Sequence, residues 1–302
     1  MMLNTPSSLS LRLRIAAHAR CLSSRRDIES AFVRDVDARL QKFHAATRDA
    51  GVAIEPRNFS FSGCGFLIPY HLGVAHALQD MGYLHPSRSR VAGASGGAIA
   101  ALAIAANADL PLVVEDTKAV AAFGRSKGSW GKLELRLREL FDARFRDVDM
   151  DALANRLTVA TQKVWPTREL VLTDAFESPQ DLCDAVIASS FIPFYLSRQA
   201  MTTFRGEFHI DGGFVKLVPE VPEHVRVCAF HADMLRRPDY EISPSMDATF
   251  PFSIWELARF ALFPPEADVL DHLFQRGRKA AVLWAESELA GRLAERDVAR
   301  GC

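Results

Sequence analysis

Three short apolar runs in this sequence each end in a glycine turn, and this arrangement limits the possible folds more than any other feature. The runs are Asn58–Ser62, Val91–Ala94 and Phe208–Asp211. Segments whose apolar residues recur at helical spacing lie between and around them. Strands that alternate with helices indicate an α/β fold with a mostly parallel sheet covered on both faces.

The remaining elements follow from periodicity and length. Apolar residues repeat every three or four positions over 27–46, so we expect a helix there that packs on the domain. A second long amphipathic helix is expected over 268–293. Further expected elements are a helix over 69–81, a small-residue helix over 96–106, strands over 169–173 and 225–230, and a helix over 181–190.

The N-terminus differs in composition from the rest of the chain. Its first 26 residues contain five Arg, five Ser and no Asp or Glu, whereas the whole chain has 36 basic and 37 acidic residues. Arg- and Ser-rich, acid-free starts are typical of organelle transit peptides, although a disordered tail fits the pattern equally well. We therefore expect a cytoplasmic protein, with mitochondrial or plastid import by residues 1–26 as the alternative.

Charge and cysteine usage narrow the function classes. The net charge of −1 provides no overall attraction for nucleic acid or anionic membranes. The five cysteines form no C-x-x-C pair, and no His, Asp and Glu cluster has metal-ligand spacing, so we expect no metal and no cofactor. The two long stretches without charge, 58–79 and 91–108, are broken by Pro and Gly or consist mainly of Ala and Gly. Any membrane contact is then expected to be peripheral.

Ser95 is the candidate nucleophile. The sequence Gly93-Ala94-Ser95-Gly96-Gly97 is a G-x-S-x-G motif between a predicted strand and a predicted helix, which is the setting that this motif requires. Its glycines allow a sharp turn that exposes the serine next to the unpaired N–H groups of a helix start. A tight turn with a capping serine is the alternative interpretation.

Two further glycine turns could complete such a site. Gly63-Cys64-Gly65 can present successive backbone N–H groups to the oxyanion of an acyl-transfer intermediate. A phosphate-binding turn is the rival, weakened because Ile68 stands where G-x-G-x-x-G needs its third glycine. In Asp211-Gly212-Gly213, an Asp at a strand end could reach into a cleft or could cap its own turn.

Taken in order, these motifs resemble the patatin-like phospholipase family, and within it the branch of adipose triglyceride lipase. Two further segments agree, Ala188–Tyr195 and Ala261–Glu266. The resemblance implies a three-layer α/β/α fold and a Ser–Asp dyad, with Ser95 as nucleophile and Asp211 as proton acceptor. It also implies an oxyanion hole from the backbone of Gly63, Cys64 and Gly65, with Gly96 as a further donor. The motif-supporting glycines are Gly93, Gly97, Gly212 and Gly213.

Composition, periodicity and the resemblance together suggest four segments of the chain, and the resemblance implies a lipid substrate. The segments are residues 1–26, an N-terminal helix and connector over 27–56, a patatin-like catalytic core over 57–235 and a C-terminal helical segment over 236–302. The expected substrate is an acyl glycerolipid, with triacylglycerol first and phospholipid second, met peripherally at a lipid droplet or membrane. The aromatic-rich segments 250–255 and 260–263 could form an interfacial patch, although packing on the core is the simpler expectation.

Three alternatives remain open. A transacylase would use the same residues, and a lipid-binding or regulatory protein could keep the fold without catalysis. A Ser–Asp–His triad would instead need a histidine after Asp211, for which His224, His231 and His272 are the candidates. Oligomeric state cannot be derived from the sequence.

Overall fold

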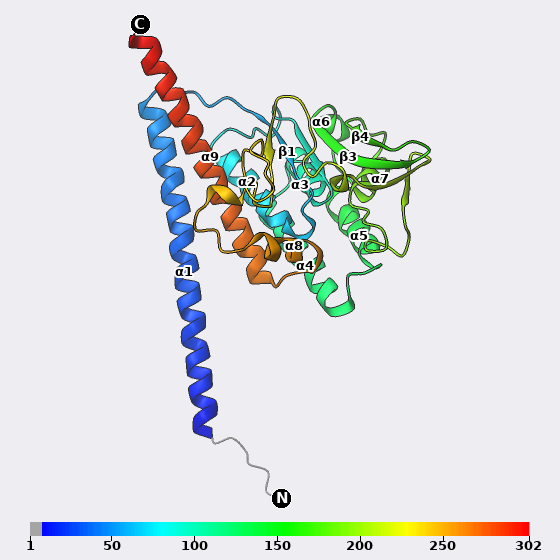
Figure 1. The fold of residues 1–302 in the computed structure, drawn as a ribbon, viewed down its shortest axis with the longest axis horizontal. Helices are drawn as coiled ribbons and strands as arrows, with labels where there is room; N and C mark the ends of the chain where they lie inside the picture. The colour runs from blue at the N-terminus through cyan, green and yellow to red at the C-terminus, as the bar shows by residue number, and fades with distance from the viewer. Residues whose placement is uncertain (1–7, 302) are drawn as a thin grey trace, which may run out of the picture.

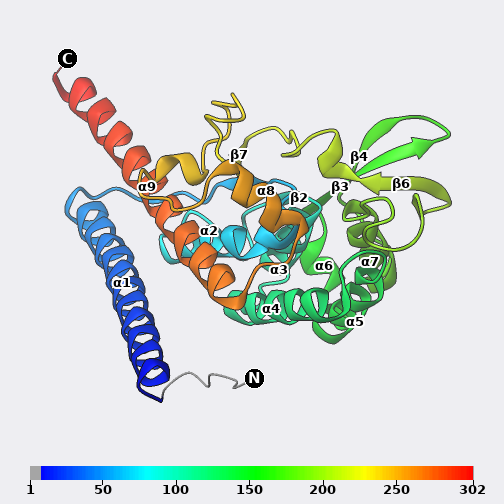
Figure 2. The ribbon, with the colours of Figure 1, turned by 60° about the horizontal axis from the view of Figure 1, so that its bottom comes forward.

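A mixed seven-stranded sheet forms the centre of the molecule, in a computed structural model that describes residues 8–301 (Figures 1 and 2). The main path of the sheet runs in the order β5-β6-β3-β2-β1-β7, and β4 pairs with β3 off this path. The strands are β1 (Asn58–Phe61), β2 (Val91–Ala94), β3 (Leu157–Trp165), β4 (Glu169–Thr173), β5 (Thr202–Phe204), β6 (Glu207–Asp211) and β7 (His224–Val227).

Helices flank this sheet, which confirms the α/β class expected from the alternating pattern. The sheet is more mixed than the pattern indicated: β7, β1, β2 and β3 are parallel neighbours, while β4, β5 and β6 pair antiparallel. The helices are α1 (Ser8–Asp49), α2 (Ile68–Asp80), α3 (Gly96–Ala105), α4 (Leu110–Lys127), α5 (Leu133–Phe145), α6 (Met150–Leu153), α7 (Pro179–Ser189), α8 (Ile254–Leu262) and α9 (Ala267–Gly301).

The predicted strands lie within a residue or two of their expected positions, except that β7 ends at Val227 instead of Phe230. Two strands were not predicted, β3 and the short β5. The omission of β3 matters because this strand pairs with β2, β4 and β6 and so joins the parallel and antiparallel regions. Its Thr- and Val-containing run has strand propensity, but it follows a charged helical region without a glycine turn.

Two long helices lie side by side at one edge of the molecule (Figures 1 and 2). The helix expected over 27–46 is the C-terminal portion of α1, which begins at Ser8, and the helix expected over 268–293 is most of α9. Residues 1–7 of the N-terminal segment lie outside the described residues, so import through residues 1–26 stays a prediction. In the described part of the chain, no helix is both long and apolar enough to cross a membrane.

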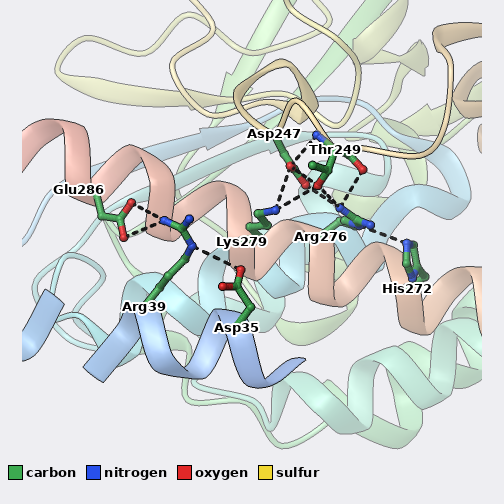
Figure 3. Close-up of polar contacts among 8 residues, drawn as sticks. All are labelled: Asp35, Arg39, Asp247, Thr249, His272, Arg276, Lys279 and Glu286. Atoms are coloured by element: carbon green, nitrogen blue, oxygen red, sulfur yellow. Dashed lines mark hydrogen bonds and ion pairs between the residues drawn. The ribbon is translucent and has the colours of Figure 1, made fainter. Parts of the chain in front are cut away.

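Charged contacts fix α1 against α9, as Figure 3 shows. Arg39 of α1 donates to Glu286 of α9 at 2.9 Å, and it also reaches Asp35 on its own helix. Further along α9, Arg276 and Lys279 both bind the buried carboxylate of Asp247. The two cationic groups also lie over the ring of Phe32 from α1. The N-terminal helix is therefore anchored to the body of the protein by its second half.

Candidate active site

Ser95 occupies a strained turn between β2 and α3. Its backbone has φ +54° and ψ −130°, a conformation that a non-glycine residue adopts only when its surroundings enforce it. A Cβ at Gly93 would overlap the backbone of Gly97, and a Cβ at Gly97 would overlap the carbonyl groups of Phe61 and Ser62. The two flanking glycines thus let α3 approach both β1 and β2, which is the elbow geometry that the G-x-S-x-G motif predicts.

The loop after β1 lies directly against this elbow. A Cβ at Gly63 would be 3.5 Å from Cβ of Ser95, and a Cβ at Gly96 would be 2.7 Å from both Sγ of Cys64 and the carbonyl oxygen of Gly65. The Gly63 amide already donates to the carbonyl of Leu217 at 2.7 Å. Within the described part of the chain, the amides of Cys64, Gly65 and Gly96 donate no hydrogen bond. These three N–H groups are free to bind an oxyanion.

The register of the sheet brings Asp211 to the same place. Ala94 of β2 pairs with Ala160 of β3, and the next β3 residue, Thr161, pairs with Asp211 of β6. The unpredicted strand β3 therefore connects two motifs that are 116 residues apart in sequence. A Cβ at Gly213 would lie 4.0 Å from Cβ of Ser95, which shows how close the Asp-Gly-Gly turn comes to the elbow.

Burial makes Asp211 a better base than an ordinary aspartate. Its side chain is 3% exposed, and this desolvation raises the pKa of the carboxyl group from 3.8 to about 6. Hydrogen bonds from the Ser95 hydroxyl and from the Gly213 amide, the latter at 2.7 Å, oppose the rise in pKa but do not cancel it. The carboxylate is therefore ionised at neutral pH and lies beside the hydroxyl that it would deprotonate.

The segment that holds the two residues together lies within Ala188–Tyr195, which was named from the sequence for its family resemblance but was assigned no role there. The Ser189 hydroxyl accepts from the Ser95 amide at 2.9 Å and donates to the carbonyl of Ala160 at 2.7 Å. Two residues later, the Phe191 carbonyl accepts from the Asp211 amide at 2.9 Å. Between them, the buried hydroxyl of Ser190 has no partner among the described residues, and Ser190 lines the cavity beside Ser95. The only signal for these roles was the Ser-Ser pair before Phe-Ile-Pro.

His71 holds the backbone just before the glycine turn at residues 63–65. Its Nε2 lies 3.0 Å from the Ser62 carbonyl oxygen and 3.2 Å from the Ser62 hydroxyl, just before Gly63. Burial lowers the pKa of the ring to about 4, so the imidazole is neutral. The Ser62 hydroxyl also accepts from the Ala229 amide at 3.1 Å. His71 thus fixes the residue that precedes the glycine turn.

The three histidines of the triad alternative make other contacts. His224 opens β7, opposite Asn58 at the start of β1, whereas the glycine turns follow the other ends of the parallel strands. His231 bonds the carbonyl of Phe252 at 2.8 Å, and His272 accepts from Arg276 at 3.1 Å. In the described residues, none of the three bonds to Ser95 or Asp211.

A narrow apolar channel begins beside Ser95. It has a volume of about 120 Å³ and is bounded by Ser95 and Gly96 at one end and by helices α3, α4, α5 and α7 along its length. Apolar side chains dominate its wall, among them Ile99, Leu102, Val113, Leu137, Phe141 and Ile187. Such a channel binds hydrocarbon by the hydrophobic effect.

Comparison with known proteins agrees with this geometry. A family model described as "Patatin-like phospholipase" matches residues 59–222, a range that includes the three glycine turns and the Ser189–Phe191 segment. The chain belongs to the patatin-like phospholipase family. This confirms the resemblance drawn from the motifs, and the matched range ends soon after Asp211-Gly212-Gly213.

Several named patatin-like relatives are similar to the chain. It is 29% identical to human omega-hydroxyceramide transacylase over 76% of this chain, but spans only 46% of that protein. It is 29% identical to human patatin-like phospholipase domain-containing protein 4 over 73% of this chain and 92% of that relative. It is 30% identical to patatin-like phospholipase domain-containing protein 2 of Mus musculus, covering 73% of this chain and 48% of the relative.

Proposed function

We propose that this protein is a serine acyl-hydrolase that cleaves fatty-acyl esters of glycerolipids. The observation that carries the proposal is a strained elbow serine beside a buried Asp211, whose pKa is raised to about 6, at an apolar channel. The serine and the aspartate supply nucleophile and base, and the channel accepts the acyl chain.

The reaction follows from the positions of these groups. The Ser95 hydroxyl attacks the ester carbonyl while Asp211 accepts its proton, and the tetrahedral intermediate carries its negative charge toward the free amides of Cys64, Gly65 and Gly96. Asp211 then returns the proton to the leaving alcohol. Water then attacks the acyl-enzyme while Asp211 accepts its proton. The proton passes to the Ser95 oxygen as the ester bond breaks, and the fatty acid is released. No metal or cofactor is required by these steps.

We favour triacylglycerol as substrate and phospholipid second. The wall of the channel beyond Ser95 is apolar, which suits an acyl chain and leaves the rest of the lipid outside. A transacylase is the second candidate, because one relative is named omega-hydroxyceramide transacylase and another 1-acylglycerol-3-phosphate O-acyltransferase Pnpla3. It would use the same acyl-enzyme with an alcohol in place of water.

Exposed apolar side chains near the channel opening support a lipid surface as the partner. Trp130 stacks on Tyr195, whose hydroxyl donates to the carbonyl of Leu262, and Phe214 follows the Asp-Gly-Gly turn. Trp130, Phe214 and Phe263, which follows Leu262, are all more than half exposed. Of the predicted interfacial segments, Phe250, Phe252 and Phe260 instead stack on one another. We propose peripheral binding to a lipid droplet or membrane, in the cytoplasm or after import.

Hydrolysis of a matched lipid panel tests the proposal. Triacylglycerol, phosphatidylcholine and lysophospholipid emulsions are incubated with the wild type, Ser95→Ala and Asp211→Asn, and released fatty acid is measured. We expect both variants to lose at least about a hundredfold in rate, because each removes one half of the proton transfer. Glycerol or a ceramide alcohol is also added as an acyl acceptor. A new ester would indicate acyl transfer, whereas free fatty acid indicates hydrolysis.

Two controls make the result decisive. Ser126→Ala changes an exposed serine whose hydroxyl donates to the carbonyl of Phe123, and it should behave as wild type. A fluorophosphonate probe should label wild type and Ser126→Ala but not Ser95→Ala. Full activity in Ser95→Ala or Asp211→Asn would exclude the dyad, and the absence of both labelling and turnover in the wild type would favour the non-catalytic alternative. Sedimentation with the emulsion reports surface binding, and a fluorescent fusion with and without residues 1–26 reports location.

A further inference from the structure

The apolar channel has a direction, which can be followed along three helices. On α3, the lining residues Ser95, Ile99 and Leu102 recur at helical spacing and lead away from the nucleophile. On α5, the wall runs from Leu133 to Phe145, which at 1.5 Å per residue is about 18 Å. That length is close to half of the roughly 30 Å hydrocarbon core of a bilayer, which is the span of one lipid acyl chain.

The near and far ends of α5 are distinct. Leu133 is at the Ser95 end, because its amide donates at 3.0 Å to the carbonyl of Leu196, which follows the segment that contacts Ser95. Helix α4 runs back beside α3, so its first turns lie near the end of α3 that is remote from Ser95. Asp116 on α4 and Arg144 on α5 therefore line the far end.

An ion pair lies at that end. Nε of Arg144 lies 2.6 Å from Oδ2 of Asp116, and Nη2 lies 3.0 Å from Oδ1, so the two helices are bridged by a bidentate pair. On its other side, Arg144 faces a second, polar hollow with Glu139, Asp142 and Asp149. Arg144 thus lines both the apolar channel and the polar hollow. The exposed fractions of the pair, 38% for Arg144 and 20% for Asp116, indicate a small contribution to stability.

We propose that the Asp116–Arg144 ion pair is the stop that sets the longest acyl chain this protein accepts. The inference rests on the proposed acyl-hydrolase function and adds its chain-length specificity. Each methylene that enters the apolar wall strengthens binding by up to about fourfold. A chain that reaches the pair gains no further apolar contact, and a longer one must separate the two charged groups, which would leave a carboxylate facing hydrocarbon.

Displacement of a fluorescent fatty acid tests the stop without requiring turnover. Saturated fatty acids from medium to very long chain, in steps of two carbons, compete for the channel of the full-length protein. For the wild type, we expect affinity to rise with chain length and then level off. In Asp116→Ala and in the double variant Arg144→Ala/Asp116→Ala, which both remove the carboxylate, the affinity should continue to rise for at least one further two-carbon step, roughly a tenfold gain for the first chain beyond the wild-type limit.

The matched control is Arg146→Ala. Arg146 directly follows α5 and forms a comparable bidentate pair with Asp142, but it does not line the apolar channel. Its chain-length profile should equal that of the wild type. An unchanged limit in both Asp116→Ala and the double variant, or an equal shift in Arg146→Ala, would overturn the proposal, as would a failure of every fatty acid to displace the probe. Circular dichroism and melting temperature verify that the variants are folded.

The two proposals fail separately. If the limit shifts as expected while no ester is hydrolysed, the chain-length stop is supported and the hydrolase function is contradicted. If esters are hydrolysed in a Ser95-dependent manner with an unchanged limit in both variants, the stop is contradicted and the hydrolase function stands.

Discussion

In the proposed reaction, the general base is a single buried carboxylate, that of Asp211. An ordinary aspartate, with a pKa near 4, is a weak base toward a serine hydroxyl. Asp211 is desolvated by the fold, and its pKa is raised to about 6. The rise is limited by hydrogen bonds from Ser95 and Gly213, so the group remains ionised at neutral pH. Burial thus brings a common side chain close to the basicity that the reaction needs at the pH of a cell.

The pH dependence of hydrolysis should follow this carboxyl group. Because the base must be ionised, kcat/KM on a soluble ester should be constant above a pH of about 6 and fall about tenfold for each pH unit below it. The measurement is a pH–rate profile with the wild type and with His224→Ala, His231→Ala and His272→Ala. All four profiles should coincide. Loss of the acidic limb in any histidine variant would instead support a triad.

The proposed catalytic residues were easier to propose from the sequence than the residues that position them. Ser95 and Asp211 were found because each lies in a glycine turn at the end of an apolar run, a local pattern with a physical cause. Ser189 was not found, since its contacts with Ser95 and Ala160 join segments far apart in sequence. The hydrogen bond from the Gly63 amide to the Leu217 carbonyl could not be predicted either, because Leu217 is far away in the sequence.

At the scale of elements, β3 decides where the site forms. The alternation of strands and helices predicted the parallel region of the sheet, but it did not reveal that β3 continues beyond β2 and pairs antiparallel with β6. Because β6 pairs with this extension, Asp211 lies beside the C-terminal end of β2. Sequence patterns specify which face of a strand is buried, whereas pairing between distant strands depends on the whole fold. The distance between the motifs could therefore not be derived in advance.

Helices α2 and α9 pack through a pair of glycines, and this contact offers a test. A Cβ at Gly277 would overlap the Tyr70 carbonyl, and a Cβ at Gly73 would overlap the Phe274 carbonyl. We expect Gly277→Ala to lower the free energy of unfolding by about 1–3 kcal/mol, because the helices must separate. Denaturant unfolding measures the change.

Gly291→Ala is the control on the same helix. Nothing described lies within 4 Å of a Cβ placed there, so the substitution should raise stability by up to about 1 kcal/mol through helix propensity alone. Opposite signs for the two variants would establish the glycine contact. A destabilisation of equal size at both positions would attribute the effect to α9 itself and contradict the packing argument.

At the scale of the whole molecule, the N-terminal helix α1 and the C-terminal helix α9 pack against each other. The second half of α1 lies along α9, and α9 lies along α2, which follows the oxyanion loop (Figure 1). The contact combines apolar packing with buried charge, since Asp247 binds both Arg276 and Lys279 beneath Phe32. Two cations share one carboxylate there, so the loop that carries Asp247 is held by α9 and covered by α1.

Removing that carboxylate should destabilise the whole fold. The side chain of Asp247 is 2% exposed, and Asp247→Asn leaves two buried cations without this counter-charge, so we expect a loss of about 3–5 kcal/mol in the free energy of unfolding. Asp35→Asn, which removes an exposed partner of Arg39 at 3.4 Å, should change it by no more than about 0.5 kcal/mol. Thermal and denaturant unfolding at neutral pH measure both variants.

The stability difference between the wild type and Asp247→Asn should depend on pH if its origin is electrostatic. Hydrogen bonds from Thr249, Arg276 and Lys279 outweigh desolvation and lower the pKa of Asp247 from 3.8 to about 2. A carboxyl group whose pKa is lower in the folded state than in the unfolded state stabilises the fold. This stabilisation is complete at pH values above the unfolded-state pKa, and it is lost as the pH falls through the folded-state pKa. The gap between wild type and Asp247→Asn should therefore persist from neutral pH to about 4 and shrink toward a pH of about 2. A gap that stays constant across this window would show that packing of the side chain, and not its charge, holds the terminal helices to the core.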